Sequence, residues 1–143
     1  MTTKTTQVRE AIVQRLLALV ADSAANIGAV CNPEQIRNPD NRAAEPQLTA
    51  VLWTMPGQML DLKGASIKWQ QPFIVDIAVP WSADAEQRCD KIRLELAAAL
   101  VSAFSDVSVL KSSLGELDTG YPAEGSGYAL ISATATFEYL EKL

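Results

Sequence analysis

Apolar side chains near the start of the chain recur at intervals of three and four residues. They are Val8, Ile12, Leu16 and Leu19. This spacing places all of them on one face of a helix, while polar residues such as Gln14 and Arg15 fall on its other faces. We therefore expect a helix from about Thr5 to Asp22.

A second helix is predicted from Ser82 to about Phe104. Its expected core stripe repeats at the helical interval and consists of Ala85, Cys89, Ile92, Leu96, Ala99 and Ala103. Ser82 is a residue type that caps helix N-termini, and Asp84 can pair with Arg88 four residues later. The last turns are apolar on nearly every side. Such an end is buried either by the sheet and the first helix together or by another subunit.

Alternation of apolar and polar residues predicts two long strands. One runs from Ile67 to Trp81, where Pro72 interrupts or bends the strand or lies at an edge, and the other runs from Tyr128 to Tyr139. Their predicted core faces consist of Phe73, Val75, Ile77, Val79 and Trp81 in the first strand, and Ala129, Ile131, Ala133, Ala135, Phe137 and Tyr139 in the second. Shorter strands are expected at Asn26–Cys31, Leu48–Thr54 and Val107–Leu117.

Segments rich in proline and glycine separate these elements. Asn32–Pro46 contains three prolines, so we expect a flexible polar loop at about 32–46, either a partner-binding arm or a tolerated excursion. Met55–Gly64 is expected to be a turn-rich connection and Thr119–Gly127 a glycine-rich turn. The order of helix, three strands, helix and two strands predicts a single α+β domain over residues 1–143. In it, two main helices pack on a largely antiparallel sheet.

The size and charge of the chain narrow the classes of function. Its 143 residues suffice for one domain. No apolar run reaches the roughly eighteen residues that span a bilayer, and the polar N-terminus lacks the pattern of a signal peptide. We therefore expect no membrane association and no export. The net charge is −5 and the basic residues do not cluster, which disfavours tight nucleic-acid binding.

Residues that could carry catalysis are sparse. The chain has no histidine, and Cys31 and Cys89 are expected to be small buried hydrophobes rather than a disulfide or a zinc site. The glycines match neither common phosphate-binding spacing. The carboxylates Asp76, Glu116 and Asp118 could in principle hydrolyse a glycoside or hold Mg²⁺, but their spacing singles out no pair. We therefore expect no catalytic residue, no cofactor and no metal.

Apolar side chains within and beside the Met55–Gly64 segment favour a protein interface. Four of them lie in a connection punctuated by glycine and proline, which is more than a solvated loop requires. Two tryptophans flank the segment, and tryptophan is enriched at interfaces. The candidate contact residues are Met55, Met59, Leu60, Leu62, Trp53 and Trp69. Trp81, by contrast, is expected to pack in the sheet because it continues a core alternation.

The order of elements resembles that of the tail terminator, or minor tail protein U, family of long-tailed phages and phage-derived particles. The similar segments are the opening helix VREAIVQRLLALV, the proline-preceded strand Pro46–Leu52, the alternating strand FIVDIAV that runs into an acidic-start helix, and the terminal SGYALISATATFEY. Together they span nearly the whole chain. The Asn32–Pro46 loop is longer than the family pattern.

The resemblance implies a structural virion assembly protein. Members of this family are small α+β proteins that form a ring capping the tail tube, so the implied partners are copies of itself in a hexamer, the tail tube protein and the head–tail connector protein. It further implies synthesis in the host cytoplasm, a final place in the virion tail or a phage-derived particle, and no cofactor. Two alternatives stay open. One is another small neck or tail-completion protein, and the other is a small carboxylate-based hydrolase or a ligand-binding domain.

Overall fold

The computed structural model describes residues 3–22, 49–105, 107–120 and 127–143. Within these residues the elements follow one another as α1 (Lys4–Asp22), β1 (Thr49–Thr54), β2 (Gln58–Lys63), β3 (Ser66–Pro80), α3 (Ala85–Val101), β4 (Lys111–Gly120) and β5 (Tyr128–Lys142). The predicted strand at Asn26–Cys31 and the predicted loop at about 32–46 lie outside the described residues.

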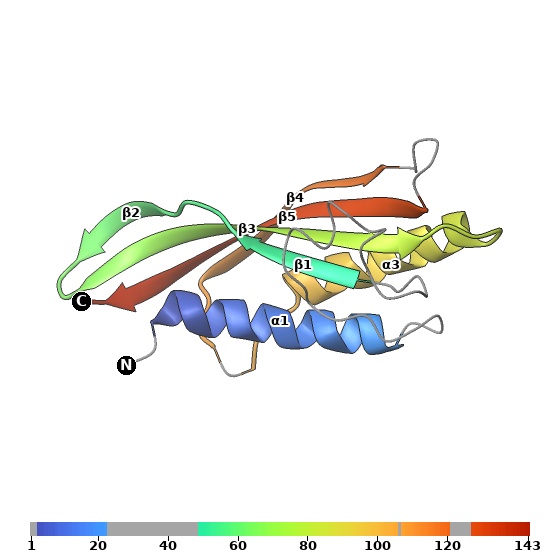
Figure 1. The fold of residues 1–143 in the computed structure, drawn as a ribbon. Coiled ribbons are helices and arrows are strands. Elements are labelled where there is room, and N and C mark those ends of the chain that lie inside the picture. Colours follow the sequence, from blue (N-terminus) through green and yellow to red (C-terminus); the bar gives the residue numbers. More distant parts are fainter. Residues whose placement is uncertain (1–2, 23–48, 106, 121–126) are drawn as a thin grey trace.

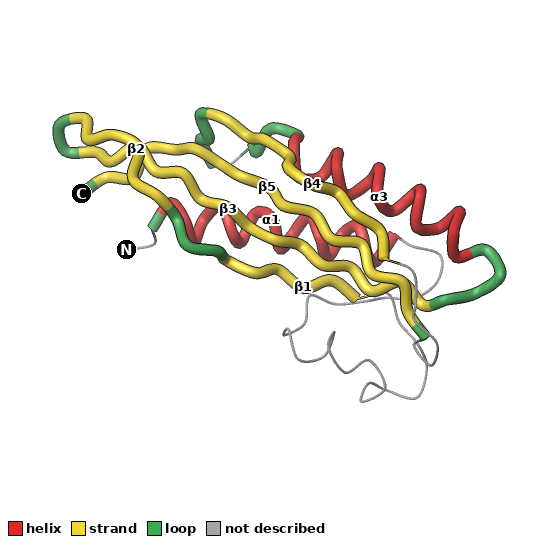
Figure 2. The backbone as a smooth tube through the Cα atoms, turned by 90° about the horizontal axis from the view of Figure 1, so that it is seen from above, coloured by secondary structure: helices red, strands yellow, loops and turns green. Residues whose placement is uncertain are grey.

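The five strands form one antiparallel sheet in the order β1-β3-β5-β4, and β2 pairs with β3 on the same side as β1 (Figures 1 and 2). β3 and β5 are 15 residues long each and pair along their whole length, so they form the centre of the sheet. The prediction of an α+β domain with two helices on a largely antiparallel sheet is confirmed.

Pro72 lies within β3 without breaking it. β2 pairs with β3 up to Gln70, and β1 pairs with it from Phe73 onward. The Pro72 carbonyl accepts a hydrogen bond from the Met55 backbone N–H at 3.1 Å, so Pro72 turns its backbone toward the junction between β1 and β2. Because the N–H and C=O of one strand residue point to the same side, the N–H that proline lacks would point into this junction. The strand therefore continues straight through a proline.

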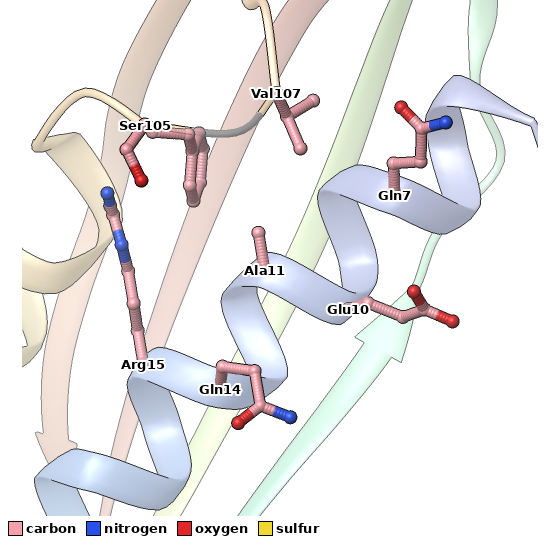
Figure 3. Close-up of a pocket in the computed structure, with 8 residues that line it drawn as sticks. Gln7, Glu10, Ala11, Gln14, Arg15, Ser105 and Val107 are labelled. Carbon is pink, nitrogen blue, oxygen red and sulfur yellow. The ribbon is translucent and has the colours of Figure 1, made fainter.

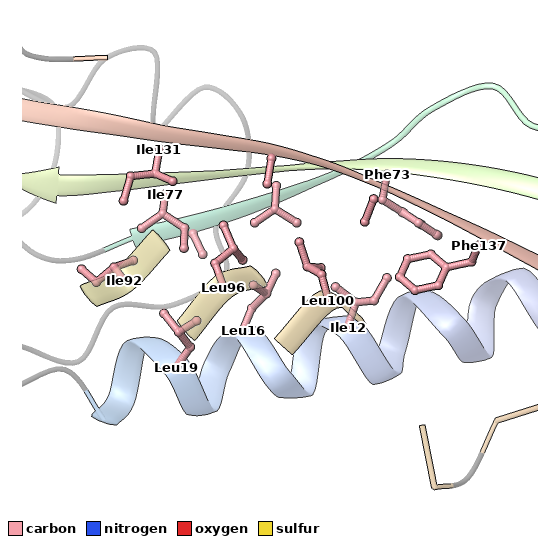
Figure 4. Close-up of a cluster of buried hydrophobic side chains, with 14 of the residues drawn as sticks. Ile12, Leu16, Leu19, Phe73, Ile77, Ile92, Leu96, Leu100, Ile131 and Phe137 are labelled. Atoms are coloured by element: carbon pink, nitrogen blue, oxygen red, sulfur yellow. The ribbon is translucent and has the colours of Figure 1, made fainter. Parts of the chain in front are cut away.

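Both helices pack on one face of the sheet, and the core lies between the layers (Figures 1 and 4). It is filled by one face of each long strand and one stripe of each helix. The members that carry most of it are Val8, Ile12, Leu16, Leu19, Phe73, Val75, Ile77, Val79, Cys89, Ile92, Leu96, Leu100, Ile131, Phe137 and Tyr139. The ring centroids of Phe73 and Phe137 are 5.9 Å apart in an edge-to-face contact. The predicted core faces are confirmed except at Trp81 and at Ala99 and Ala103.

The differences lie at the ends of elements. Trp81 is 42% exposed because β3 ends at Pro80, so the expectation that Trp81 packs in the sheet is wrong. In α3 the last core position is Leu100, whereas Ala99 is partly buried and Ala103 is exposed. β4 runs over Lys111–Gly120 rather than the predicted Val107–Leu117.

The start of α3 also differs from the prediction. The N-cap residue is Asp84 rather than Ser82, and its side chain makes no capping hydrogen bond among the described residues. Instead the Ser82 hydroxyl donates to the Asp84 carboxylate at 2.6 Å, and this bond is the main reason that the pKa of Asp84 is lowered. The charge of Arg88 lowers that pKa less, and within the described chain no ion pair joins the two side chains.

Candidate functional site

The segment expected to be a turn-rich connection contains a strand. Gln58–Lys63 forms β2 and pairs with β3 through a tight turn at Gly64, whose φ of 59° lies in the left-handed region that favours glycine. β2 carries a bulge between Met59 and Asp61. Because of the extra residue, the apolar positions Met59 and Leu62 stand three apart yet lie on one face. Such a spacing does not read as an alternating strand, which is why the prediction was wrong here.

β2 belongs to an extension of the sheet at one end of the molecule. We define the sheet extension as β2 together with residues 66–70 of β3 and 138–142 of β5, which pair with one another. Its tip reaches past the N-terminal end of α1 (Figures 1 and 2). There the backbone N–H of Lys4 donates to both oxygens of the Glu141 carboxylate, at 2.9 and 2.8 Å. These two hydrogen bonds join the first residue of α1 to β5. The layer of helices therefore begins at this point along the sheet.

The two faces of the sheet extension differ in character. Register places Met59 opposite Trp69 and Leu62 opposite Ile67, on the face that continues the core toward the helices. The other face is mostly charged: it carries Asp61, Lys63, Lys68, Glu138 and Lys142, together with the exposed Leu140. On it Glu138 stands between two lysines, 3.8 Å from Lys68 and 3.9 Å from Lys111. We call the face toward the helices the helix-side face. The charged side chains of the other face favour contact with water, whereas the apolar side chains of the helix-side face do not.

β2 is the one described strand whose residues are all exposed. Met59 is 55%, Leu60 40% and Leu62 58% exposed. A strand at a sheet edge that shows apolar side chains to solvent invites pairing or docking by another chain. These three of the six candidate residues are therefore exposed apolar side chains on one strand.

The other three candidates contribute to packing within the domain. Trp69 is half-buried against Gly57, where an added Cβ would lie 2.4 Å from the indole ring. Its Nε1 donates to Gln71 at 2.9 Å, and the buried Gln71 amide in turn donates to the Met55 carbonyl. Trp53 lies on the opposite face of the sheet and donates to Asp76 at 2.8 Å. Trp69, Met55 and Trp53 are thus partly buried and hydrogen-bonded.

A second exposed apolar surface lies on α3. Its core stripe faces the sheet and α1, but Leu94, Ala98 and Val101 are exposed, the leucine at 71% and the valine at 48%. Steps of four and three residues align them along one side of the helix. We call them the α3 stripe. The sheet and α1 therefore do not cover the apolar end of this helix on every side.

Arg15 has a role that its place on a polar helix face did not reveal. Its guanidinium donates to the carbonyls of Ala99 and Ser102 at 2.6 and 2.7 Å and also to that of Ala103. It lies over the Phe104 ring, 4.0 Å from the centroid. The last carbonyls of a helix lack partners within the helix and carry partial negative charge. Arg15 therefore joins α1 to the C-terminal end of α3.

A groove of about 650 Å³ lies beside this contact (Figure 3). It is lined by Gln7, Glu10, Ala11, Gln14, Arg15, Phe104, Ser105 and Val107. The carboxylates considered for hydrolysis lie elsewhere, since Asp76 is on the outer sheet face and Glu116 and Asp118 are exposed on β4. Among the described residues no group of three or more histidine, cysteine, aspartate and glutamate side chains could hold a metal ion.

No protein-family model matches the sequence, and no curated protein matches it. No helix in the described part of the chain has the length and apolarity needed to cross a membrane.

Proposed function

We propose that the chain is a structural subunit of a phage tail or phage-derived particle, a tail terminator that assembles into a ring on the end of the tail tube. Its partners would be copies of itself, the tail tube protein and the head–tail connector protein. The observation that carries the proposal is the exposed apolar face of the sheet extension, with Met59 and Leu62 at its centre. The sequence resemblance supplies the biological setting.

Two features support assembly rather than binding of a small ligand. The exposed apolar side chains lie on a projecting strand and on a helix side, not in an enclosed cavity. Concave apolar pockets are typical of small-ligand sites, whereas surfaces of this kind are typical of contacts between proteins. The groove in Figure 3 has a lining of mixed polar and apolar character, and its arginine already donates hydrogen bonds to the end of α3.

Electron microscopy tests the proposal directly. Purified protein, alone and mixed with assembled tail tubes, should give rings, and rings should be found at tube ends. A protein that stays monomeric under both conditions would contradict the role. A neck or tail-completion protein would instead bind the head connector without capping tubes.

A further inference from the structure

The helix-side face of the sheet extension is the continuation of the core face. Along β3 the same side of the strand carries the buried Phe73 and Gln71, then the half-buried Trp69 and Ile67. One strand further out, Met59 and Leu62 continue that face and are exposed. Within the subunit this face is covered by helices that pack apolar stripes on it. A helix with an apolar stripe is therefore the surface that fits its uncovered end.

The chain itself exposes such a helix side. The α3 stripe, formed by Leu94, Ala98 and Val101, lies on the side of α3 away from the buried Ile92 and Leu96. In one helix, residues at these spacings make a ridge of the kind that packs on a sheet or a second helix.

The charges beside the α3 stripe are compatible with burial. Asp90 is paired with Arg93 at 3.0 Å, and Glu95 with Lys91 at 3.8 Å. Each acidic side chain along this part of the helix thus has a basic partner within the same helix. The helix-side face of the sheet extension likewise presents Met59, Leu62 and Ile67, and its one carboxylate, Glu141, is taken up by the Lys4 backbone. Contact between the two surfaces buries no unpaired charge.

We infer that the helix-side face of the sheet extension in one copy packs on the α3 stripe of a second copy. The inference rests on the proposed function, because it specifies the contact through which the ring would form. The two surfaces differ, so the contact is head-to-tail and leaves one of each free at the ends of any open chain of subunits. Head-to-tail contacts of this kind close into rings when the rotation between subunits permits.

Two double variants remove the surfaces one at a time. Met59→Thr/Leu62→Thr keeps a residue with strand preference in β2, and Leu94→Gln/Val101→Gln keeps a good helix former in α3. Leu130→Thr serves as the control, because Leu130 is exposed on the outer sheet face, away from both surfaces. Thermal unfolding followed by circular dichroism confirms that each variant is folded. Light scattering over a concentration series then measures self-association.

Wild type and Leu130→Thr should assemble alike, and each double variant should raise the dissociation constant at least about tenfold, since few central side chains carry most of an interface. Mixing the two double variants is the decisive step. Each retains the surface that the other lacks, so an equimolar mixture should form a dimer of one copy of each and nothing larger.

Other outcomes would overturn the inference. If the α3 double variant assembles like wild type, the α3 stripe is not the partner surface, although the proposed function survives. If both double variants fail and their mixture stays monomeric, the contact is not head-to-tail between these surfaces. If wild type itself stays monomeric at every concentration, with and without tail tubes, the proposed function fails as well.

Discussion

Single polar residues join elements that lie far apart in the sequence. Several of their contacts cannot be recognised from the sequence. Arg15 looks like any solvated arginine of an amphipathic helix, yet it reaches carbonyls more than eighty positions away. Gln71 falls on the core face of a strand and is buried because its amide bonds to Trp69 and to backbone carbonyls. Periodicity predicts which face a residue is on, but it does not predict polar partners that only the tertiary fold brings together.

Replacing Arg15 with alanine should destabilise the fold by about 2–3 kcal/mol. The change removes charged hydrogen bonds to the end of α3 and the contact with Phe104. Arg15→Lys keeps the charge but not the forked donor, so we expect it to lose about half as much. Urea unfolding measures both. Equal stability of wild type and Arg15→Ala would show that these contacts contribute nothing net.

Cys89 should make stability depend on pH in the alkaline range. Burial is the main cause that raises the pKa of its thiol above the ordinary value of 9.0. Above pH 9 the unfolded chain ionises this thiol while the folded chain keeps it neutral. The contribution of Cys89 to stability is therefore full below pH 9 and is lost as pH rises through the folded-state pKa.

The comparison that isolates this effect is Cys89→Ala. The free-energy difference between wild type and variant, measured by urea unfolding, should shrink as pH rises from 8 to above 9. The variant controls for every other group that titrates in this range, including Tyr139, whose pKa burial also raises. A difference that is constant with pH would refute the assignment.

Whole elements were predictable where a single period runs through them. α1, β3 and β5 follow from the spacing of their apolar residues because each packs one uninterrupted face on the core. The edge strands did not follow. β2 carries a bulge at Met59/Asp61, and β4 carries one between Leu114 and Leu117, which puts those two leucines on the same face. A bulge shifts the apparent period from two to three, so the sequence pattern predicts a connection where β2 lies and the wrong limits for β4.

The candidate site was predictable in part for the same reason. An excess of apolar residues over 55–64 predicts contact residues in this segment, and the structure exposes Met59, Leu60 and Leu62 there. It could not separate these from Met55, Trp53 and Trp69, which the fold buries partly. The α3 stripe was visible only as a helix end that is apolar all round, because sequence does not show which side the neighbouring elements leave open.

Substitutions in the sheet extension should therefore separate into two classes. Met59→Thr/Leu62→Thr should change the free energy of unfolding by no more than about 0.5 kcal/mol, since both side chains are largely exposed. Gly57→Ala should cost about 1–3 kcal/mol, because the added Cβ would overlap the Trp69 indole. Thermal or urea unfolding distinguishes the classes. A large loss for the double variant would place Met59 and Leu62 in the folding core and remove them from the interface.

At the scale of the whole molecule, charge and surface character point to contacts with proteins. The net charge of −5 would repeat in every copy of the proposed ring, which would then carry a strongly negative field that repels other polyanions. The basic residues that are described are scattered, and Lys68, Lys91, Arg93 and Lys111 are each paired with an acidic side chain. We therefore expect neighbouring copies to contact the exposed apolar side chains of the sheet extension and of the α3 stripe.

Binding to double-stranded DNA should be undetectable at physiological salt and at most weak and salt-sensitive at low salt. The reason is that the basic residues in the described part of the chain form no row that could displace the counterions of the phosphates. A fluorescence titration with a short duplex at two salt concentrations measures this. Micromolar or tighter binding at physiological salt would move the protein toward a role in handling nucleic acid.

The central claim is that the exposed face of the sheet extension assembles copies of this chain into a closed ring. Native mass spectrometry of wild type and Met59→Thr/Leu62→Thr, at matched concentrations, tests it most directly. Wild type should give one dominant species at an integral multiple of 15.4 kDa, six by the family resemblance, while the double variant stays at the monomer mass. A wild-type protein that is monomeric throughout, or a double variant that forms the same assembly as wild type, would contradict the claim.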